Sequence, residues 1–156
     1  MKVILEGCDG TGKSTLAKKL AEKYHCDILA MTAWGTRDVK KYFDRYANDD
    51  IISDRCFISE VVYSKALNKQ SKVSDEDFKL LMEYVKAQGF KIIVLNQTAS
   101  VLKERLKARG DESEEILNNV VKIQAEYMFL ANEYNLPIVF GDKDCLENIS
   151  LILEGK

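Results

Sequence analysis

The sequence predicts an α/β protein of three layers, in which helices cover both faces of a parallel sheet of five strands. Short apolar runs alternate with longer amphipathic segments along the chain, as in strands joined by right-handed helical crossovers. The chain has 156 residues, 46% of them hydrophobic, which is enough for one sizeable core. No linker rich in Pro, Gly or Ser interrupts the alternation, and Pro137 is the only proline. We therefore expect a single domain over residues 1–156.

Five short apolar runs are the expected strands. The first, Val3 to Leu5, is apolar at every position and is soon closed by Gly7, as in a strand buried on both faces. The clearest run covers 90–95 and holds four aliphatic residues in a row. In chain order, the expected strands span residues 3–5, 26–30, 51–54, 90–95 and 136–140.

The expected helices lie between these runs. Over residues 13–24, apolar side chains recur at helical spacing, with lysines on the opposite face. Ser74 followed by Asp77 resembles a capping box and predicts the start of a helix that Gly89 ends. The other helices are expected over residues 36–48, 57–67, 99–108, 116–134 and 145–154.

Charge and cysteine content disfavour several classes of protein. The chain has 23 basic and 25 acidic residues, so no overall positive field would hold a long nucleic acid. No apolar run reaches the length of about 18 residues typical of a membrane span, and no signal peptide is recognisable. The four cysteines form no C-x-x-C pair, which fits reduced thiols. We expect a cytoplasmic protein without a membrane or long nucleic-acid partner.

The segment from Gly7 to Ser14 matches G-x-x-x-x-G-K-[ST], the phosphate-binding P-loop, and lies between an expected buried strand and an amphipathic helix. Its glycines let backbone N–H groups point at phosphate oxygens, and the helix N-terminus adds about half a positive charge. We expect Lys13 to reach the β and γ phosphates of ATP and Ser14 to bind Mg²⁺. The residues expected to hold Mg·ATP are Gly7, Asp9, Gly10, Thr11, Gly12, Lys13, Ser14 and Thr15.

The P-loop indicates the phosphoryl donor and leaves the acceptor open, because GTPases, other NTPases and small-molecule kinases share it. A GTPase needs a guanine-reading N-K-x-D sequence after a later strand, whereas the strand ending at Leu95 is followed by Asn-Gln-Thr. The length leaves little room for the added modules of motor or AAA-type ATPases. The sequence therefore favours a small kinase that acts on a small-molecule nucleotide.

Strand 51–54 ends at Asp54 and is followed by Arg55. Ligands bind at the carboxyl ends of parallel strands in open α/β folds. The guanidinium of Arg55 can hold two phosphate oxygens at once, which would orient an acceptor monophosphate in line with the γ-phosphate of ATP. We expect Asp54 to hold Mg²⁺ or its waters. The alternative for both residues is a surface salt bridge at a strand end.

Three blocks of the sequence carry a family resemblance. Residues 6–15 resemble the E-G-x-D-G-x-G-K-S-T opening of the thymidylate kinases. Residues 54–59 with Tyr63 are similar to the D-R-[YH]-x-x-S-x-x-x-[YF] segment of that family, with Cys56 at its aromatic or His position. Residues 102–111 resemble the helix entering the family's lid, and 127–131 its following Y-x-x-L-A helix.

This resemblance implies a reaction in which ATP and a deoxynucleoside monophosphate, most readily dTMP, give ADP and the diphosphate. Arg55 would bind the acceptor phosphate, and Asp9 would lie near the acceptor sugar. Ser59 and Tyr63 match acceptor-pocket positions of the family.

Two arginines match the family's lid, a segment of about residues 105–115. Arg105 and Arg109 would close over the transferred phosphoryl group. Because the P-loop itself holds no arginine, either could supply the charge that stabilises the transition state. The alternative for both is a solvated charge on a helix.

Three aromatic residues, Trp34, Phe57 and Tyr63, could stack on or wall a nucleobase, or could be plain core residues. Arg37 is a further acceptor-site candidate. Because the segment from Met31 to Arg37 lacks the R-E-P-G sequence of the thymidylate kinases, the base preference stays open.

Other functions compete with a monophosphate kinase. A deoxynucleoside kinase phosphorylates a 5'-hydroxyl and benefits from a general base, often a carboxylate just after the second strand; Met31 to Trp34 holds none, although Asp54 could serve. A kinase for modified bases or polynucleotide ends is disfavoured by the balanced charge. A nucleotide-binding module without turnover would not need Arg55 or the lid arginines.

A homodimer is conceivable, since related kinases often dimerise through a helix beside the sheet. The segment 57–67 is apolar enough for such a contact through Ile58, Val61, Val62 and Ala66. The alternative is that these side chains pack in the core of their own chain.

Overall fold

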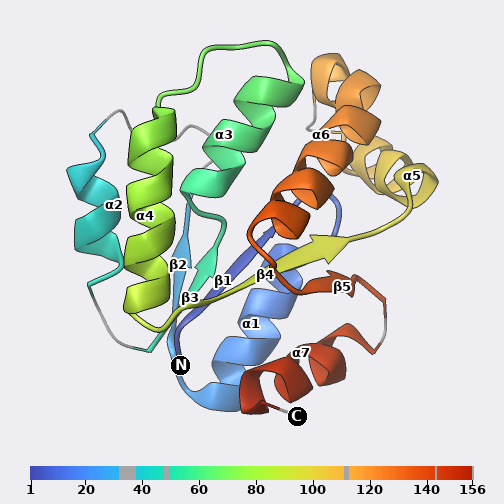
Figure 1. Cartoon of the computed structure of the whole chain (residues 1–156). Coiled ribbons are helices and arrows are strands. Elements are labelled where there is room, and N and C mark those ends of the chain that lie inside the picture. Colours follow the sequence, from blue (N-terminus) through green and yellow to red (C-terminus); the bar gives the residue numbers. More distant parts are fainter. Residues whose placement is uncertain (32–37, 48–49, 111–112, 143, 156) are drawn as a thin grey trace.

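The computed structural model describes residues 1–31, 38–47, 50–110, 113–142 and 144–155, within which five strands form one parallel sheet in the order β2-β3-β1-β4-β5 (Figure 1). The strands are β1 (Val3–Gly7), β2 (Asp27–Ala30), β3 (Ile51–Asp54), β4 (Lys91–Asn96) and β5 (Ile138–Phe140). The helices are α1 (Lys13–Tyr24), α2 (Lys40–Arg45), α3 (Phe57–Ala66), α4 (Asp75–Ala87), α5 (Ala99–Arg109), α6 (Glu114–Glu133) and α7 (Cys145–Glu154). The predicted α/β class with five parallel strands is confirmed.

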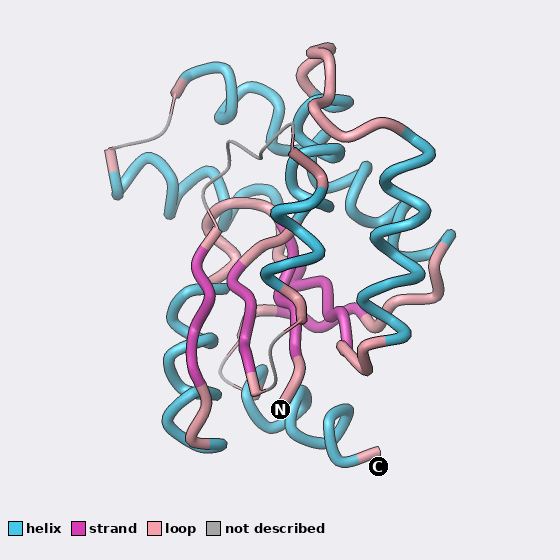
Figure 2. The backbone as a smooth tube through the Cα atoms, turned by 90° about the vertical axis from the view of Figure 1, so that its left-hand side faces the viewer, coloured by secondary structure: helices cyan, strands magenta, loops and turns pink. Residues whose placement is uncertain are grey.

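Strands β1 and β4 each contribute to two separate cores. In β1, Val3 and Leu5 join the core under α1 and α7, whereas Ile4 joins the core on the opposite face, under α3, α4 and α6. Figure 2 shows helices on both sides of the strands. Because both faces of the sheet are covered, β1 is apolar on successive positions instead of alternating with polar residues.

Local capping explains where several elements begin. The Ser74 hydroxyl accepts the N–H of Asp77 at 3.1 Å, so the predicted capping at the start of α4 is confirmed. Helix α6 begins earlier than predicted because Ser113 caps it. Strand β5 is shorter than predicted: Pro137 has no N–H, and its carbonyl accepts the N–H of Val94 at 2.9 Å just before the strand starts.

The apolar side of α3 faces the core. Ile58, Val62 and Ala66 are at most 5% exposed and belong to the core under α3, α4 and α6. These three side chains are therefore not available to a second chain, and the dimer contact considered for them is wrong. The alternative, that they pack in the core of their own chain, is confirmed. Val61 is partly exposed.

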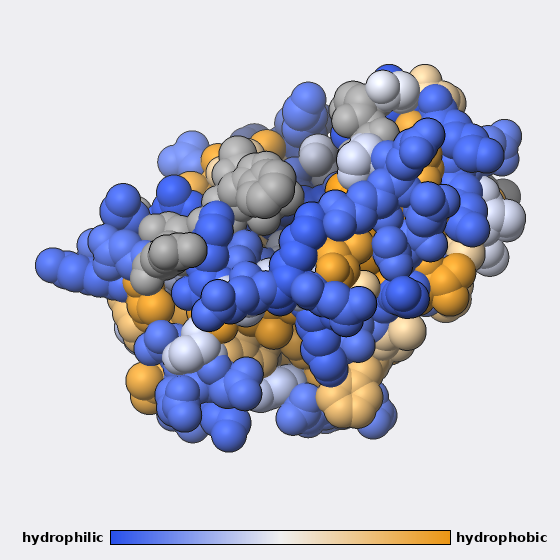
Figure 3. All heavy atoms as spheres, turned by 90° about the horizontal axis from the view of Figure 1, so that it is seen from above, coloured by the Kyte–Doolittle hydropathy of each residue, from blue (hydrophilic) through white to orange (hydrophobic). Residues whose placement is uncertain are grey.

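The face of the molecule seen from above is largely polar. Figure 3 shows a mainly hydrophilic face when the molecule is seen from above, with hydrophobic residues in small groups between polar ones. None of the helices in the described part of the chain is both long and apolar enough to span a bilayer.

Candidate functional site

The P-loop joins β1 to α1 and owes its shape to glycine. Gly7, Gly10 and Gly12 have positive φ angles of 139°, 85° and 93°. A Cβ atom on Gly7 would lie 2.2 Å from the carbonyl oxygen of Leu95 in β4, so no larger residue fits there. Gly12 is the N-cap of α1, whose first turn holds no acidic residue. The positive end of α1 is thus presented to the cavity that the P-loop lines.

Lys13 is buried at the base of this loop. Its Nζ donates hydrogen bonds to the carbonyl oxygens of Gly7 at 2.7 Å and Cys8 at 2.8 Å. Burial, reinforced by the nearby charge of Arg55, lowers the pKa of Lys13 to about 8. The ammonium is held by these two neutral carbonyls and, at 3.4 Å, by the Thr11 hydroxyl, and an anionic phosphate oxygen would be a stronger partner than any of them.

The end of β3 offers oxygen atoms for a cation. Asp54 is 9% exposed, and its Oδ1 atom is buried without a hydrogen-bond partner among the described residues. Asp54 and Ser14 line the same cavity. Nowhere in the described ranges do three or more His, Cys, Asp or Glu side chains gather as metal ligands. The two oxygens fit Mg²⁺, which takes few protein ligands and completes its shell with phosphates and water.

Arg55 lies between the P-loop and α3. Its backbone N–H donates to the carbonyl oxygen of Leu5 in β1 at 3.0 Å, with φ at 75°. Its guanidinium forms an ion pair with Asp9, donates from Nη1 to the Ser59 hydroxyl at 3.2 Å, and lies 5.4 Å from the ring centre of Tyr63. Arg55 thus lines the cavity as a positioned cation and not as a surface salt bridge.

Asp9 completes this cluster from the P-loop. The Tyr63 hydroxyl donates to its Oδ2 atom at 2.6 Å. Burial alone would raise the pKa of Asp9, but the charges of Arg55 and Lys13, with the Tyr63 hydrogen bond, outweigh it and hold that pKa below its usual range. Asp9 is therefore ionised and is an acceptor for hydroxyl or guanidinium groups.

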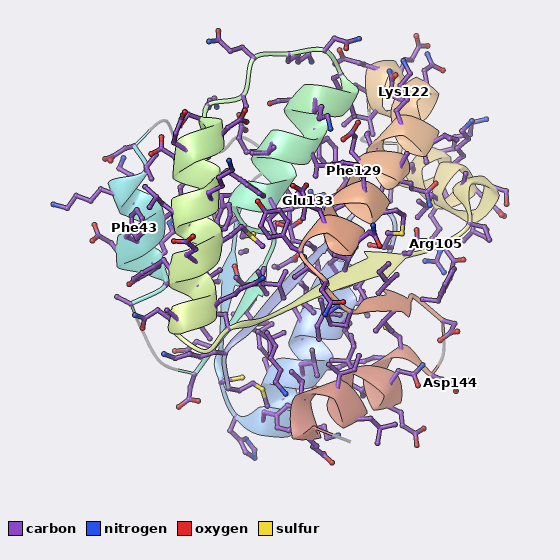
Figure 4. The ribbon with its side chains drawn as sticks, viewed as in Figure 1. Phe43, Arg105, Lys122, Phe129, Glu133 and Asp144 are labelled. Carbon is purple, nitrogen blue, oxygen red and sulfur yellow. The ribbon has the colours of Figure 1, made fainter. Side chains whose placement is uncertain are left out.

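The two predicted lid arginines lie on α5 beside the P-loop. Arg105 donates from Nη1 to the carbonyl oxygen of Gly10 at 2.9 Å, and Figure 4 shows it on the side of α5 that faces the strand ends. Arg109 follows one turn later and lines the same cavity. Both arginines thus line the cavity beside the P-loop.

One cavity of about 870 Å³ connects these groups. It runs along the P-loop, past the end of β3 and the arginines of α5, to the loop after β5. In that loop a Cβ on Gly141 would lie 2.4 Å from the carbonyl oxygen of Thr11, so the loop touches the P-loop backbone closely. Sequence reasoning missed Gly141; its place directly after the last expected strand was the available signal.

The remaining predicted site residues have different outcomes. Phe57 is fully buried and makes edge-to-face contacts with Tyr42 and Phe78, so it is a core residue with no surface to offer a base. Trp34 and Arg37 lie outside the described residues. Sequence reasoning also missed Glu6, which is 0% exposed and forms hydrogen bonds behind Arg55.

Known proteins resemble this chain over most of its length. A family model described as AAA domain matches residues 3–128. The SPbeta prophage-derived protein YorR of Bacillus subtilis is 32% identical over 116 residues, which cover 70% of each chain. A probable thymidylate kinase of Saccharolobus solfataricus is 25% identical over 173 residues (91% of this chain, 89% of the relative), and a guanylate kinase of Clostridium perfringens is 25% identical over 177 (97% and 81%).

Solved structures agree with the fold. The crystal structure of YorR in complex with phosphorylated GDP superimposes with a TM-score of 0.80 and 25% identity, covering 99% of this chain and 96% of that one. A deoxyadenosine kinase from M. mycoides superimposes with a TM-score of 0.64 at 19% identity over both whole chains, a likeness of fold alone. The relatives include kinases named for thymidylate and for guanylate, so the resemblance extends to P-loop nucleotide kinases and not to thymidylate kinases in particular.

Proposed function

Since the chain belongs to the P-loop kinase-like family described as AAA domain, we propose that it transfers the γ-phosphoryl group of Mg·ATP to a deoxynucleoside monophosphate, with dTMP as the first candidate acceptor. The observation that carries the proposal is one cavity that joins the P-loop to Arg55 on one side and to Arg105 and Arg109 on another. A phosphoryl-transfer enzyme needs this arrangement, because donor and acceptor phosphates must meet end to end.

The charges of the cavity support two phosphorylated ligands. Its described lining has three acidic side chains, Asp9, Asp54 and Asp142, and a larger number of basic ones. These are Lys13, Lys19, Arg55, Arg105 and Arg109. An excess of fixed cations suits a triphosphate together with a monophosphate better than a triphosphate with a neutral nucleoside.

In the proposed reaction an oxygen of the acceptor phosphate attacks the γ-phosphorus, and the bond from that phosphorus to the β,γ-bridging oxygen breaks to release ADP. The acceptor oxygen is already ionised at neutral pH, so the protein has no proton to remove. Arg55 would orient the acceptor, while Lys13 and the α5 arginines would bind the oxygens on which charge develops. Mg²⁺ held by Ser14 and Asp54 would neutralise further charge on the phosphates.

The acceptor base has two sources of support. The P-loop and Asp54-Arg55 blocks resemble those of thymidylate kinases and support dTMP. The guanylate kinase relatives, and the phosphorylated GDP in the YorR complex, support a guanine nucleotide as the next candidate.

A deoxynucleoside kinase is the second candidate, and Asp54 is the observation that favours it. A 5'-hydroxyl acceptor must lose its proton, and the Oδ1 atom of Asp54 has no hydrogen-bond partner among the described residues. The same atom fits Mg²⁺, so only the acceptor distinguishes the two functions.

The test measures ADP release from ATP with dTMP, dGMP, dUMP, dCMP or dAMP as the acceptor. Parallel reactions use the five deoxynucleosides that correspond to these monophosphates. We expect one or more monophosphates to stimulate release and Lys13→Ala to abolish it. Stimulation by nucleosides alone would establish the second candidate. Binding of ATP without stimulation by any acceptor would leave a nucleotide-binding module and end the kinase proposal.

A further inference from the structure

Glu6 is a buried carboxylate one residue before the P-loop. It is 0% exposed and lies near the end of β1, the central strand of the sheet. Its Oε1 atom accepts the backbone N–H groups of Cys56 at 2.6 Å and Ser59 at 3.2 Å. Its Oε2 atom accepts the hydroxyls of Ser59 at 2.7 Å and Tyr127 at 3.0 Å. Four donor groups, two backbone N–H groups and two hydroxyls, thus converge on one buried carboxyl group.

These bonds make Glu6 the cap of α3, although it lies 50 residues earlier in the chain. Cys56, the N-cap by position, offers only its sulfur, which accepts the N–H of Ile58 at 3.4 Å. Thiol sulfur is a weak acceptor. A carboxylate at the same end satisfies N–H groups that the thiol leaves over and interacts favourably with the helix dipole. Glu6 therefore ties the start of α3 to β1.

The Ser59 hydroxyl connects this cap to Arg55. Because it donates its proton to Glu6, its lone pairs face the other neighbours, and one accepts Nη1 of Arg55 at 3.2 Å. The Tyr127 hydroxyl lies 2.9 Å from the same oxygen. Arg55 thus has Asp9 on one side and, on the other, a hydroxyl whose direction is set by Glu6.

We propose that Glu6 is a positioning residue for Arg55: through Ser59 it holds the guanidinium in the direction that binds an acceptor phosphate. Tyr127 extends the same cluster to α6, the helix that follows the lid helix α5. This inference rests on the proposed function for its substrate, but its geometry is independent of turnover. The competing explanation is that Glu6 only stabilises the fold.

The key variant is Glu6→Gln, which keeps the size of the side chain and one carbonyl oxygen for the N–H groups of α3. We expect the KM of the acceptor monophosphate to rise about tenfold, because a residue that positions a binding group from behind typically has an effect of this size. The KM of ATP should change less than about twofold. Glu60→Gln is the matched control: Glu60 is a buried carboxylate on α3 that accepts the N–H of Lys72 at 2.9 Å, far in sequence from the P-loop. It should lower the melting temperature without changing either KM.

A double variant tests whether the effect passes through Ser59. If Glu6 acts through the Ser59 hydroxyl, Glu6→Gln combined with Ser59→Ala should raise the acceptor KM no further than Ser59→Ala alone. If the two substitutions instead raise the acceptor KM by fully additive free energies, Glu6 does not act through Ser59. Equal changes of the ATP and acceptor KM in Glu6→Gln would overturn the positioning role and leave Glu6 a stabilising residue.

A spectroscopic measurement separates this inference from the proposed function. Two fixed partners should slow rotation of the Arg55 guanidinium about its Nε–Cζ bond, which ¹⁵N NMR resolves, with Arg55→Lys used to assign the signal. We expect faster rotation in Glu6→Gln and unchanged rotation in Glu60→Gln. Unchanged rotation in both would reject the inference even if the kinase is active, whereas absence of turnover in the wild type would reject the function and leave this result standing.

Discussion

The two sides of the cavity, which we propose bind the phosphoryl donor and the acceptor, are built in opposite ways. On the donor side, backbone N–H groups, a helix end and Lys13 form the cradle from one continuous segment. On the acceptor side, Arg55 is held by side chains from separate elements, with Asp9 and Ser59 as its direct partners. The donor side is thus specified by local sequence, and the acceptor side by the packing of β1 against β3 and α3. Substitutions on one side should therefore change the kinetic constants of one substrate and leave those of the other nearly unchanged.

The largest effect should come from removing the donor-side cation. Lys13→Ala should lower kcat by about 1,000-fold, because a positioned charge that meets the transferred phosphoryl group is lost. Steady-state kinetics checks this, with Lys18→Ala, an exposed lysine of the same helix, as the control expected to match wild type. A kcat within about tenfold of wild type would show that the cradle works without its lysine.

On the acceptor side, Arg55→Lys should raise the KM of the acceptor by about 100-fold and leave the KM of ATP nearly unchanged. A lysine keeps the charge but cannot contact Asp9, Ser59 and a phosphate together through a planar fork. Initial rates at varied ATP and acceptor concentrations measure both constants. A parallel rise in both would mean that the two sides of the cavity are not separate.

Local sequence patterns predict parts of both sides for a physical reason. The positions of the P-loop, of α1 and of Asp54 and Arg55 at the end of β3 could be predicted, because they depend on local backbone shape and on position at a strand end. The contacts of Glu6 could not be predicted, because they require β1 to lie beside β3, a neighbour relation that spacing along the chain does not contain. The suggestion that Phe57 walls a nucleobase was wrong for a related reason. The local sequence around an aromatic residue that follows a strand does not show whether its side chain faces the core or a ligand.

A smaller effect should appear with pH on the donor side. The lowered pKa of Lys13, about 8, means that the free protein loses this charge as pH rises through that value, while a bound phosphate favours the protonated form. The affinity for Mg·ATP should therefore be constant below about pH 7 and about tenfold weaker at about pH 9. Calorimetry can follow this. Lys13→Arg stays charged over that range, so its affinity should not fall.

The smallest effect should come from a substitution of Gly141. It tests whether the shape of the P-loop depends on a contact with a segment distant in the sequence. In Gly141→Ala the new Cβ would meet the Thr11 carbonyl oxygen at 2.4 Å, so either the loop after β5 or the P-loop must shift. An overpacking cost of about 1 kcal/mol, shared between them, corresponds to about fivefold weaker ATP binding. Gly89→Ala is the control: its φ of 83° strains alanine, but nothing lies within 4 Å, so it should lower stability and leave ATP binding unchanged. If Gly141→Ala binds ATP like wild type, the cradle does not depend on this contact, and the donor side is as local in structure as it is in sequence.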